Sequence, residues 1–228
     1  MNSMGIKMRL LILIITFGLS IFAVSCNDKS SNPQGAFDVY GRIIYRPVLA
    51  QPQSEAIFYL YHNGQGIRHA LITVRSDTIP VVDSIGGYYQ RALEDSIGDT
   101  LSYKITSDFG SEEGQVIIPD TVTIIRLDTT IYIGRDFFVA WRQGIRIDGY
   151  FAYLEDQNGL VAVVKESPLD TSTNMPGTNI VQIGADKFWL ETLSGAFSTA
   201  ATPGGKIMPK GIVGAAANYR EVYVTSQR

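Results

Sequence analysis

The sequence has little cysteine and little histidine. Cys26 is the single cysteine among 228 residues, which excludes an intramolecular disulfide framework and any cysteine-rich zinc or iron–sulfur site. His62 and His69 are the only two histidines, so few side chains are suited to metal binding or proton transfer near neutral pH. We therefore predict no cofactor and no metal site.

The sequence also lacks an excess of positive charge. It carries 19 Lys and Arg against 22 Asp and Glu, a formal net charge of −3. Nucleic-acid binding needs a basic face that displaces counterions from phosphates, so we expect no nucleic-acid partner. With 45% hydrophobic and 18% charged residues, the composition is that of a globular protein and not of a disordered chain.

The first 25 residues have the order of an export signal. Lys7 and Arg9 precede an apolar run over residues 10–24, and small Ser25 ends that run. A helix of this run, at about 1.5 Å per residue, is shorter than the roughly 30 Å hydrocarbon core of a membrane. We predict a signal peptide over residues 1–25. Its removal takes away two positive charges and leaves a more acidic protein.

The residues Ala23-Val24-Ser25-Cys26 resemble the bacterial lipobox. The resemblance implies cleavage before Cys26 and a lipid on that cysteine, which would hold the protein to a membrane. We expect a lipid-anchored protein of the bacterial cell envelope, facing the periplasm or the cell surface. Two other interpretations stay open, a signal-peptidase site that releases a soluble protein and an uncleaved anchor.

Residues 26–35 are predicted to be the lipidated cysteine and a flexible tether, because residues 27–35 contain no large apolar side chain. Nine flexible residues span roughly 16 Å. The folded part would therefore stay close to its anchor.

The rest of the chain predicts an all-β fold. Short segments rich in β-branched and aromatic residues alternate with Gly, Asn, Asp and Pro about every ten residues, the spacing of β-sandwiches. We predict two tandem immunoglobulin-like β-sandwich domains, over residues 36–119 and 120–228. Residues 122–133 are either a linker strand or the first strand of the second domain. The expected strands are 37–45, 56–61, 70–74, 88–93, 101–106, 115–118, 137–141, 150–155, 160–164, 180–183, 187–193, 211–217 and 221–225.

Two stretches of the second half resemble fibronectin type III domains. Phe138-Val139-Ala140-Trp141 and, eight residues later, Gly149 to Leu154 are similar to the second and third strands of that family, and the resemblance implies that Trp141 lies in the core. In the first half, Ala70 to Val74 and Gly87-Tyr88-Tyr89 are similar to immunoglobulin-like modules of exported bacterial proteins. Such modules usually bind, space or present, and seldom catalyse.

Candidate catalytic and metal-binding groups are few. No G-x-S-x-G nucleophile elbow occurs, and we predict no catalytic residues. His62 and His69 could approach each other across a Gly-rich turn, but a metal site there would need further ligands, for which Glu55 is the nearby candidate. We interpret the two histidines as surface residues. Asp156-x-Asn158-Gly159 lacks the later ligands of a calcium loop and is interpreted as a hairpin turn. Calcium binding by loop carboxylates is left open for Asp95 with Asp99 and for Glu112 with Glu113.

Aromatic residues are the remaining candidates for ligand binding. Adjacent aromatics on a strand point to opposite faces, so one ring of each pair is expected in the core and the other outside. We single out Trp189, Tyr89 and Tyr219, and Trp189 first because it shares a face with Lys187 and Glu191. The sequence predicts a non-enzymatic binding or structural module with an unidentified envelope protein or glycan as partner. The alternatives are a carbohydrate-binding accessory protein of a glycan-processing system and a degradative enzyme.

Overall fold

The computed structural model describes residues 37–47, 53–83, 85–156, 159–178 and 180–226. They belong to one compact unit, Asn32–Arg228. The predicted signal peptide, Cys26 and the tether lie outside the described residues. Within the described ranges the secondary structure is β throughout, and no helix has the length and apolar character needed to cross a membrane.

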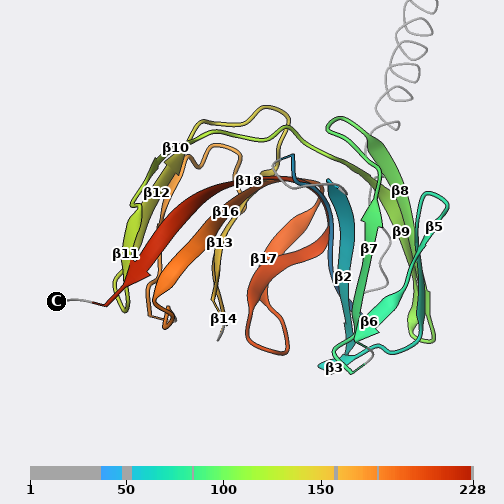
Figure 1. Ribbon diagram of the computed structural model, residues 1–228. Helices are drawn as coiled ribbons and strands as arrows, with labels where there is room; N and C mark the ends of the chain where they lie inside the picture. The colour runs from blue at the N-terminus through green and yellow to red at the C-terminus, as the bar shows by residue number, and fades with distance from the viewer. Residues whose placement is uncertain (1–36, 48–52, 84, 157–158, 179, 227–228) are drawn as a thin grey trace, which may run out of the picture. The chain divides into compact units, whose positions relative to one another are not determined.

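One long sheet organises the fold (Figure 1). In spatial order its main strands are β14 (Gly159–Lys165), β13 (Gly149–Asp156), β16 (Gly184–Ser194), β18 (Ile207–Thr225), β1 (Asp38–Tyr45), β2 (Ser54–His62), β7 (Tyr88–Leu93) and β6 (Val81–Asp83). Three short strands extend it: β11 (Thr130–Tyr132) and β17 (Phe197–Ala201) pair with β18, and β3 (Gln65–Gly66) pairs with β2.

Two smaller sheets pack against the outer face of the long sheet, one over each half (Figure 1). The four-stranded sheet consists of β5 (Asp77–Ile79), β4 (Ala70–Val74), β8 (Thr100–Ser107) and β9 (Gly110–Ile117). The three-stranded sheet consists of β10 (Ile124–Leu127), β12 (Phe137–Trp141) and β15 (Ser172–Met175). The predicted all-β sandwich fold is confirmed.

On β1 and β12 the alternation of apolar residues places the side chains as the sequence predicts. On β1, Val39 and Ile43 enter the first core. On β12, Phe137, Val139 and Trp141 enter the second core, and Trp141 is 1% exposed beside Tyr150. The position implied for Trp141 by the resemblance to fibronectin type III domains is therefore observed.

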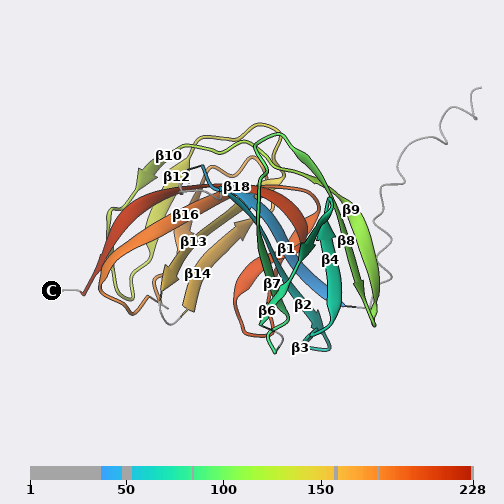
Figure 2. The same cartoon turned by 45° about the vertical axis from the view of Figure 1, so that its right-hand side comes forward.

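Strand β18 joins the two sandwiches. It pairs in parallel with β1 from Tyr40↔Gly211 to Tyr45↔Ala216, and antiparallel with β16 from Gly184↔Val224 to Ser194↔Gly214. Figure 2 shows β1 between β18 and β2. The two predicted sandwiches therefore share one continuous sheet, whereas their expected boundary between residues 119 and 120 stays a prediction.

Two local predictions differ from the structure. The expected strands 211–217 and 221–225 are one uninterrupted strand, because residues 214–224 keep one register with β16. Residues 180–183 are not a strand. Since β18 ends at Thr225, its ladder with β16 begins only at Gly184, and Ile180 instead buries its side chain in the second core.

Residues 122–133 belong to the second sandwich. They form β10, which pairs with β12, and β11, which pairs with β18. Val122, Ile124 and Ile131 are buried in the second core. The segment contributes one strand to each of two sheets, so it is neither a single linker strand nor a single first strand of the second domain.

Candidate functional site: the inner face of the long sheet

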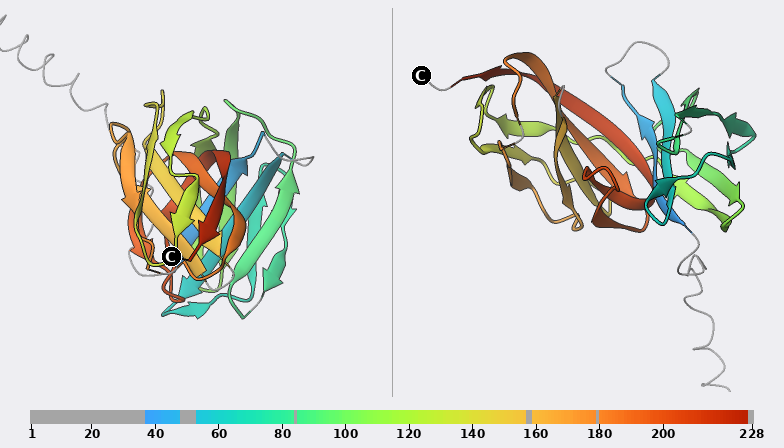
Figure 3. Two further views of the ribbon diagram at one scale, coloured as in Figure 1. Left: turned by 60° about the vertical axis from the view of Figure 1, so that its left-hand side comes forward. Right: turned by 90° about the horizontal axis from the view of Figure 1, so that it is seen from below.

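The long sheet has a second buried face, which we call the inner face. It is the face opposite both sandwich cores, and it carries a cluster that includes Tyr40, Ile44, Phe151, Tyr153 and Val213. In the described part of the chain this face is covered by the hairpin of β17 and β18, and not by another sheet (Figure 1 and Figure 3, right). The Tyr40 hydroxyl donates a hydrogen bond of 2.9 Å to the carbonyl oxygen of Ala201 in that hairpin.

A first row of aromatic rings crosses the inner face in the second half of the chain. Tyr153 on β13 lies opposite Trp189 on β16, and Trp189 lies opposite Tyr219 on β18. The ring centroids are 6.4 Å apart for Tyr153 and Trp189 and 5.1 Å apart for Trp189 and Tyr219. Trp189 and Tyr219 are partly exposed.

A second row crosses the first half. Tyr40 on β1, Tyr59 on β2 and Tyr88 on β7 are opposite one another. The rings of Tyr59 and Tyr88 stack at 4.8 Å with an interplanar angle of 20°, and both are partly exposed. Cross-strand aromatic pairs stabilise a sheet surface, so both rows are held at fixed spacing.

A cavity of about 260 Å³ lies on this face. Its walls include Tyr59 and Tyr88 from the second row, Tyr153 from the first row, and Lys206 next to the start of β18. Two larger, more open depressions of about 380 and 520 Å³ contain no residue of either row.

A polar network connects the two rows along the cavity. The Tyr88 hydroxyl donates to Gln90 Oε1 at 2.6 Å, and Gln90 Nε2 donates to Glu55 Oε2 at 2.6 Å. Glu55 forms an ion pair with Arg46, whose guanidinium lies 5.4 Å from the centroid of the Trp189 ring. The network fixes the positions of two charged groups that line the cavity, Glu55 and Arg46.

A buried ion pair lies beside this network. Arg42 Nη1 on β1 donates to both carboxylate oxygens of Glu191 on β16 at 2.9 Å, and the Tyr153 hydroxyl donates to Glu191 at 3.0 Å. The side chains of Arg42 and Glu191 are 9% and 0% exposed. The Arg42 guanidinium also lies 5.0 Å from the centroid of the Phe151 ring.

The surroundings of Arg42 and Tyr153 keep both side chains protonated, so that both can donate hydrogen bonds to Glu191. Burial acts to lower the pKa of Arg42, but the Glu191 carboxylate, together with Tyr153 and Tyr59, acts to raise it, and the net result is a pKa above its ordinary value. Burial, and then the Glu191 carboxylate, raise the pKa of Tyr153. Arg42 therefore stays charged, and Tyr153 stays protonated, at any pH near neutrality.

Two hydrogen-bond donors at the cavity have no acceptor. Arg42 Nε and Arg46 Nε are buried and make no hydrogen bond to any residue that the structure describes, and both side chains line the cavity. A buried donor without an acceptor costs roughly 1–3 kcal/mol, so native proteins seldom keep one without a reason.

The structure separates the three aromatic residues that the sequence singles out. Trp189 and Tyr219 lie side by side in the first row, and Glu191 and Lys187 share their face as expected. Tyr89 lies instead in the first core, 1% exposed, and its hydroxyl donates to the Ile67 carbonyl oxygen at 2.9 Å. The prediction for Tyr89 is therefore corrected, because its neighbour Tyr88 takes the inner-face position.

The other sequence candidates have ordinary surroundings. The His62 ring stacks on Phe109 at 3.9 Å, His69 is exposed, and Glu55 belongs to the cavity network. Among the described residues no group of three or more His, Cys, Asp or Glu side chains is arranged to hold a metal ion.

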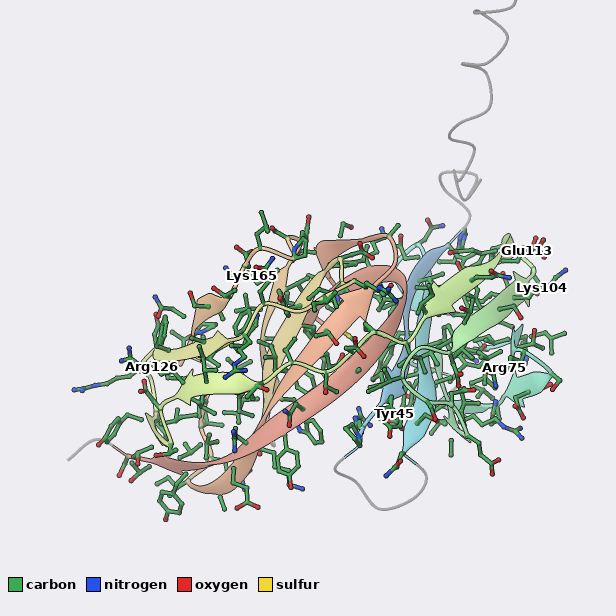
Figure 4. All side chains as sticks on the ribbon, turned by 90° about the horizontal axis from the view of Figure 1, so that it is seen from above. Tyr45, Arg75, Lys104, Glu113, Arg126 and Lys165 are labelled. Atoms are coloured by element: carbon green, nitrogen blue, oxygen red, sulfur yellow. The ribbon has the colours of Figure 1, made fainter. Side chains whose placement is uncertain are left out.

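Of the carboxylates that left calcium binding open, Asp95 and Asp99 do lie in a loop, whereas Glu112 and Glu113 lie on β9, so the prediction of a loop for this second pair is wrong. Asp95, Asp99 and Glu113 each have a cationic neighbour. Arg75 contacts Asp95 at 2.7 Å and Asp99 at 3.5 Å. Lys104 contacts Glu113 at 3.2 Å on the four-stranded sheet, where Figure 4 shows both side chains. Residues 157 and 158 of the predicted turn, and Cys26, lie outside the described residues.

Sequence reasoning missed Arg42, Arg46, Tyr59, Tyr88 and Gln90 as site residues. The alternation on β1 does place Arg42 on the face opposite the first core. Its partner Glu191 is 149 positions away in the chain, and no local pattern predicts that pairing.

No family model and no curated protein matches this sequence. Among solved structures, the chain is similar to the FN1–FN3 domains of chicken CNTN1, with 11% identity, a TM-score of 0.25, and coverage of 82% of this chain and 66% of that one. It is also similar to the BSP domain of a biofilm-associated protein, with 14% identity, a TM-score of 0.28, and coverage of 83% and 29%. The chain thus spans less than two thirds of either structure, and at these TM-scores neither bears on its function.

Proposed function

We propose that this protein is a lipid-anchored, non-catalytic binding module of the bacterial cell envelope, and that the inner face of the long sheet binds its ligand. The observation that carries the proposal is the pair of aromatic rows, in which Trp189, Tyr219, Tyr59 and Tyr88 are partly exposed. The rows lie beside a polar cavity, on a face that no other sheet covers in the described part of the chain. Binding sites usually combine a concave, partly aromatic surface with a few fixed polar groups.

The same observation favours a carbohydrate as the ligand. A sugar ring has apolar faces that stack on aromatic rings and hydroxyl groups that need hydrogen-bond partners at its edge. Trp189, Tyr219, Tyr59 and Tyr88 supply the rings, and the Glu55 network supplies the polar groups. The function proposed is therefore carbohydrate binding at an envelope surface, as an accessory to a system that processes glycans.

The anchor is proposed from the sequence alone. Mass spectrometry of the protein from the membrane fraction should find acyl chains on Cys26. The variant Cys26→Ser should move to the soluble fraction, because several acyl chains are needed for durable attachment. An unmodified Cys26 in a soluble protein would contradict the proposed anchor. Ligand binding by the inner face does not depend on the anchor, so it is tested in a separate experiment.

Binding is tested by removing one ring of the first row. Trp189→Ala should weaken the affinity of the full-length protein for its best ligand in an oligosaccharide panel by about tenfold, equivalent to about 1.4 kcal/mol. Phe138→Ala is the matched control, because Phe138 is also partly exposed and lies 5.1 Å from the guanidinium of Arg126, but on the three-stranded sheet. Equal losses in both variants, or no binding to any member of the panel, would contradict the proposal.

A further inference from the structure

Cationic side chains predominate around the inner-face cavity. Arg42, Arg46 and Lys206 line it together with one carboxylate, that of Glu55, although the chain as a whole has a net charge of −3. Arg42 pairs with Glu191, and Arg46 pairs with Glu55. In the described part of the chain, no carboxylate forms an ion pair with Lys206. The surroundings of the cavity therefore keep an uncompensated positive charge.

The hydrogen-bonding capacity of the cavity is also unbalanced. Arginine has donors and no acceptor, and the Nε–H groups of Arg42 and Arg46 are both unpaired. The carboxylate of Glu55 already accepts from Gln90 and pairs with Arg46. A ligand group that supplies hydrogen-bond acceptors and negative charge therefore matches this site better than a neutral hydroxyl group does. A small rotation of either guanidinium would bring its Nε–H within reach of such a group.

The size of the cavity limits what enters it. Its volume of about 260 Å³ is below the roughly 300–1,000 Å³ of pockets that enclose drug-sized ligands. It has room for one sugar unit, and residues of both aromatic rows line it.

We propose that the cavity binds the carboxylate of a uronic acid unit, so that the ligand of this protein is an acidic polysaccharide. The inference rests on the proposed carbohydrate binding and adds its ligand class. Lys206 supplies the uncompensated charge, Arg42 and Arg46 supply the unpaired donors, and the aromatic rows hold the sugar rings on either side.

The test compares acids with their methyl esters, which keep the sugar rings and lose the negative charge. The full-length protein is titrated calorimetrically with tetramers of galacturonate, mannuronate and glucuronate and with the ester of each. At least one acid should bind about tenfold more tightly than its ester, since a charge-assisted hydrogen bond is roughly twice as strong as a neutral one.

Two lysine variants test whether the preference for the acid over its ester arises at the cavity. Lys206→Gln should weaken binding of that acid by about two- to fivefold, the range for an ion pair made by an exposed lysine, and leave binding of the ester unchanged. Lys104→Gln is the control, because Lys104 is also exposed but lies on β8 in the four-stranded sheet (Figure 4). It removes the same charge and should change neither affinity.

The outcomes separate this inference from the proposed function. If acid and ester bind equally, and Trp189→Ala weakens both, the acidic ligand is wrong and carbohydrate binding stands. Equal weakening by Lys206→Gln and Lys104→Gln would show a general charge effect and overturn the cavity as the site. If no acid and no ester binds, the acidic ligand is overturned, and the neutral members of the oligosaccharide panel then decide the proposed function.

Discussion

The two faces of the long sheet are buried by different chemistry. On the outer face, Ile43, Phe58 and Leu190 are all 0% exposed and pack under the two smaller sheets. On the inner face, Arg42 and Glu191 are 8% and 0% exposed and are held by each other and by Tyr153. The outer face is completed by apolar packing, whereas the inner face has ordered polar groups beside a cavity.

The two faces therefore differ in what they contribute to the stability of the fold and in what they offer to a ligand. Apolar packing is non-directional and stabilises the sandwiches. A polar network on a face without a second sheet adds little net stability, because desolvation offsets much of the attraction between charges. Fixed charges and rings are, however, what a ligand can contact. We therefore attribute the stability of the fold chiefly to the outer face, and the inner face is the surface for which we propose ligand binding.

The largest stability effect should come from the outer face. Trp141→Ala removes a core ring that is 1% exposed, and such truncations cost up to about 5 kcal/mol through lost burial and the remaining cavity. Unfolding by urea, followed by circular dichroism, measures the loss. A cost below about 1 kcal/mol would show that the second core does not carry the fold.

The inner-face ion pair should behave differently. Arg42→Met leaves Glu191 with Tyr153 as its remaining donor and should cost about 3 kcal/mol, the lower end for a buried pair that loses one partner. The double variant Arg42→Met with Glu191→Leu should recover most of that loss, because no buried charge remains. If the double variant is as unstable as the single one, the pair itself stabilises the fold.

Part of this arrangement follows from the sequence. The apolar alternation of Phe137, Val139 and Trp141 predicts their common face, and the adjacency of Phe188 and Trp189 predicts that one ring is buried and the other is not. The parallel pairing of β1 with β18 brings together residues from the two ends of the described chain. Periodicity carries no information on such distant pairs, so neither the shared sheet nor the cavity was predicted.

Strand β18, which joins the two sandwiches, packs closely against β9 at Gly214. A Cβ at Gly214 would lie 1.9 Å from the Ile117 carbonyl oxygen, so Gly214→Ala must push β18 away from β9 and should cost about 1–3 kcal/mol. Gly204→Ala is the control, because its nearest neighbour, Thr202 Oγ1, would be 3.8 Å away. Similar melting temperatures for both variants would show that β18 tolerates displacement at this contact.

The smallest stability effect is expected at the proposed ligand surface. Lys206 is exposed and lies outside any strand, so Lys206→Gln should change the free energy of unfolding by no more than about 0.5 kcal/mol. Urea unfolding of this variant and of the unsubstituted protein makes the comparison. A larger loss would mean that Lys206 serves the fold as well as the ligand.

The two tryptophans report on the two faces separately. Trp141 lies in the second core and Trp189 on the inner face, and they are the only two in the sequence. The variant Trp141→Phe leaves Trp189 as the single fluorophore, and Trp189→Phe leaves Trp141. The most direct measurement is acrylamide quenching of both variants with and without a saturating oligosaccharide. The ligand should protect Trp189 from acrylamide and leave the quenching of Trp141 unchanged, whereas a bound ligand that leaves Trp189 equally accessible would contradict the inner face as the binding surface.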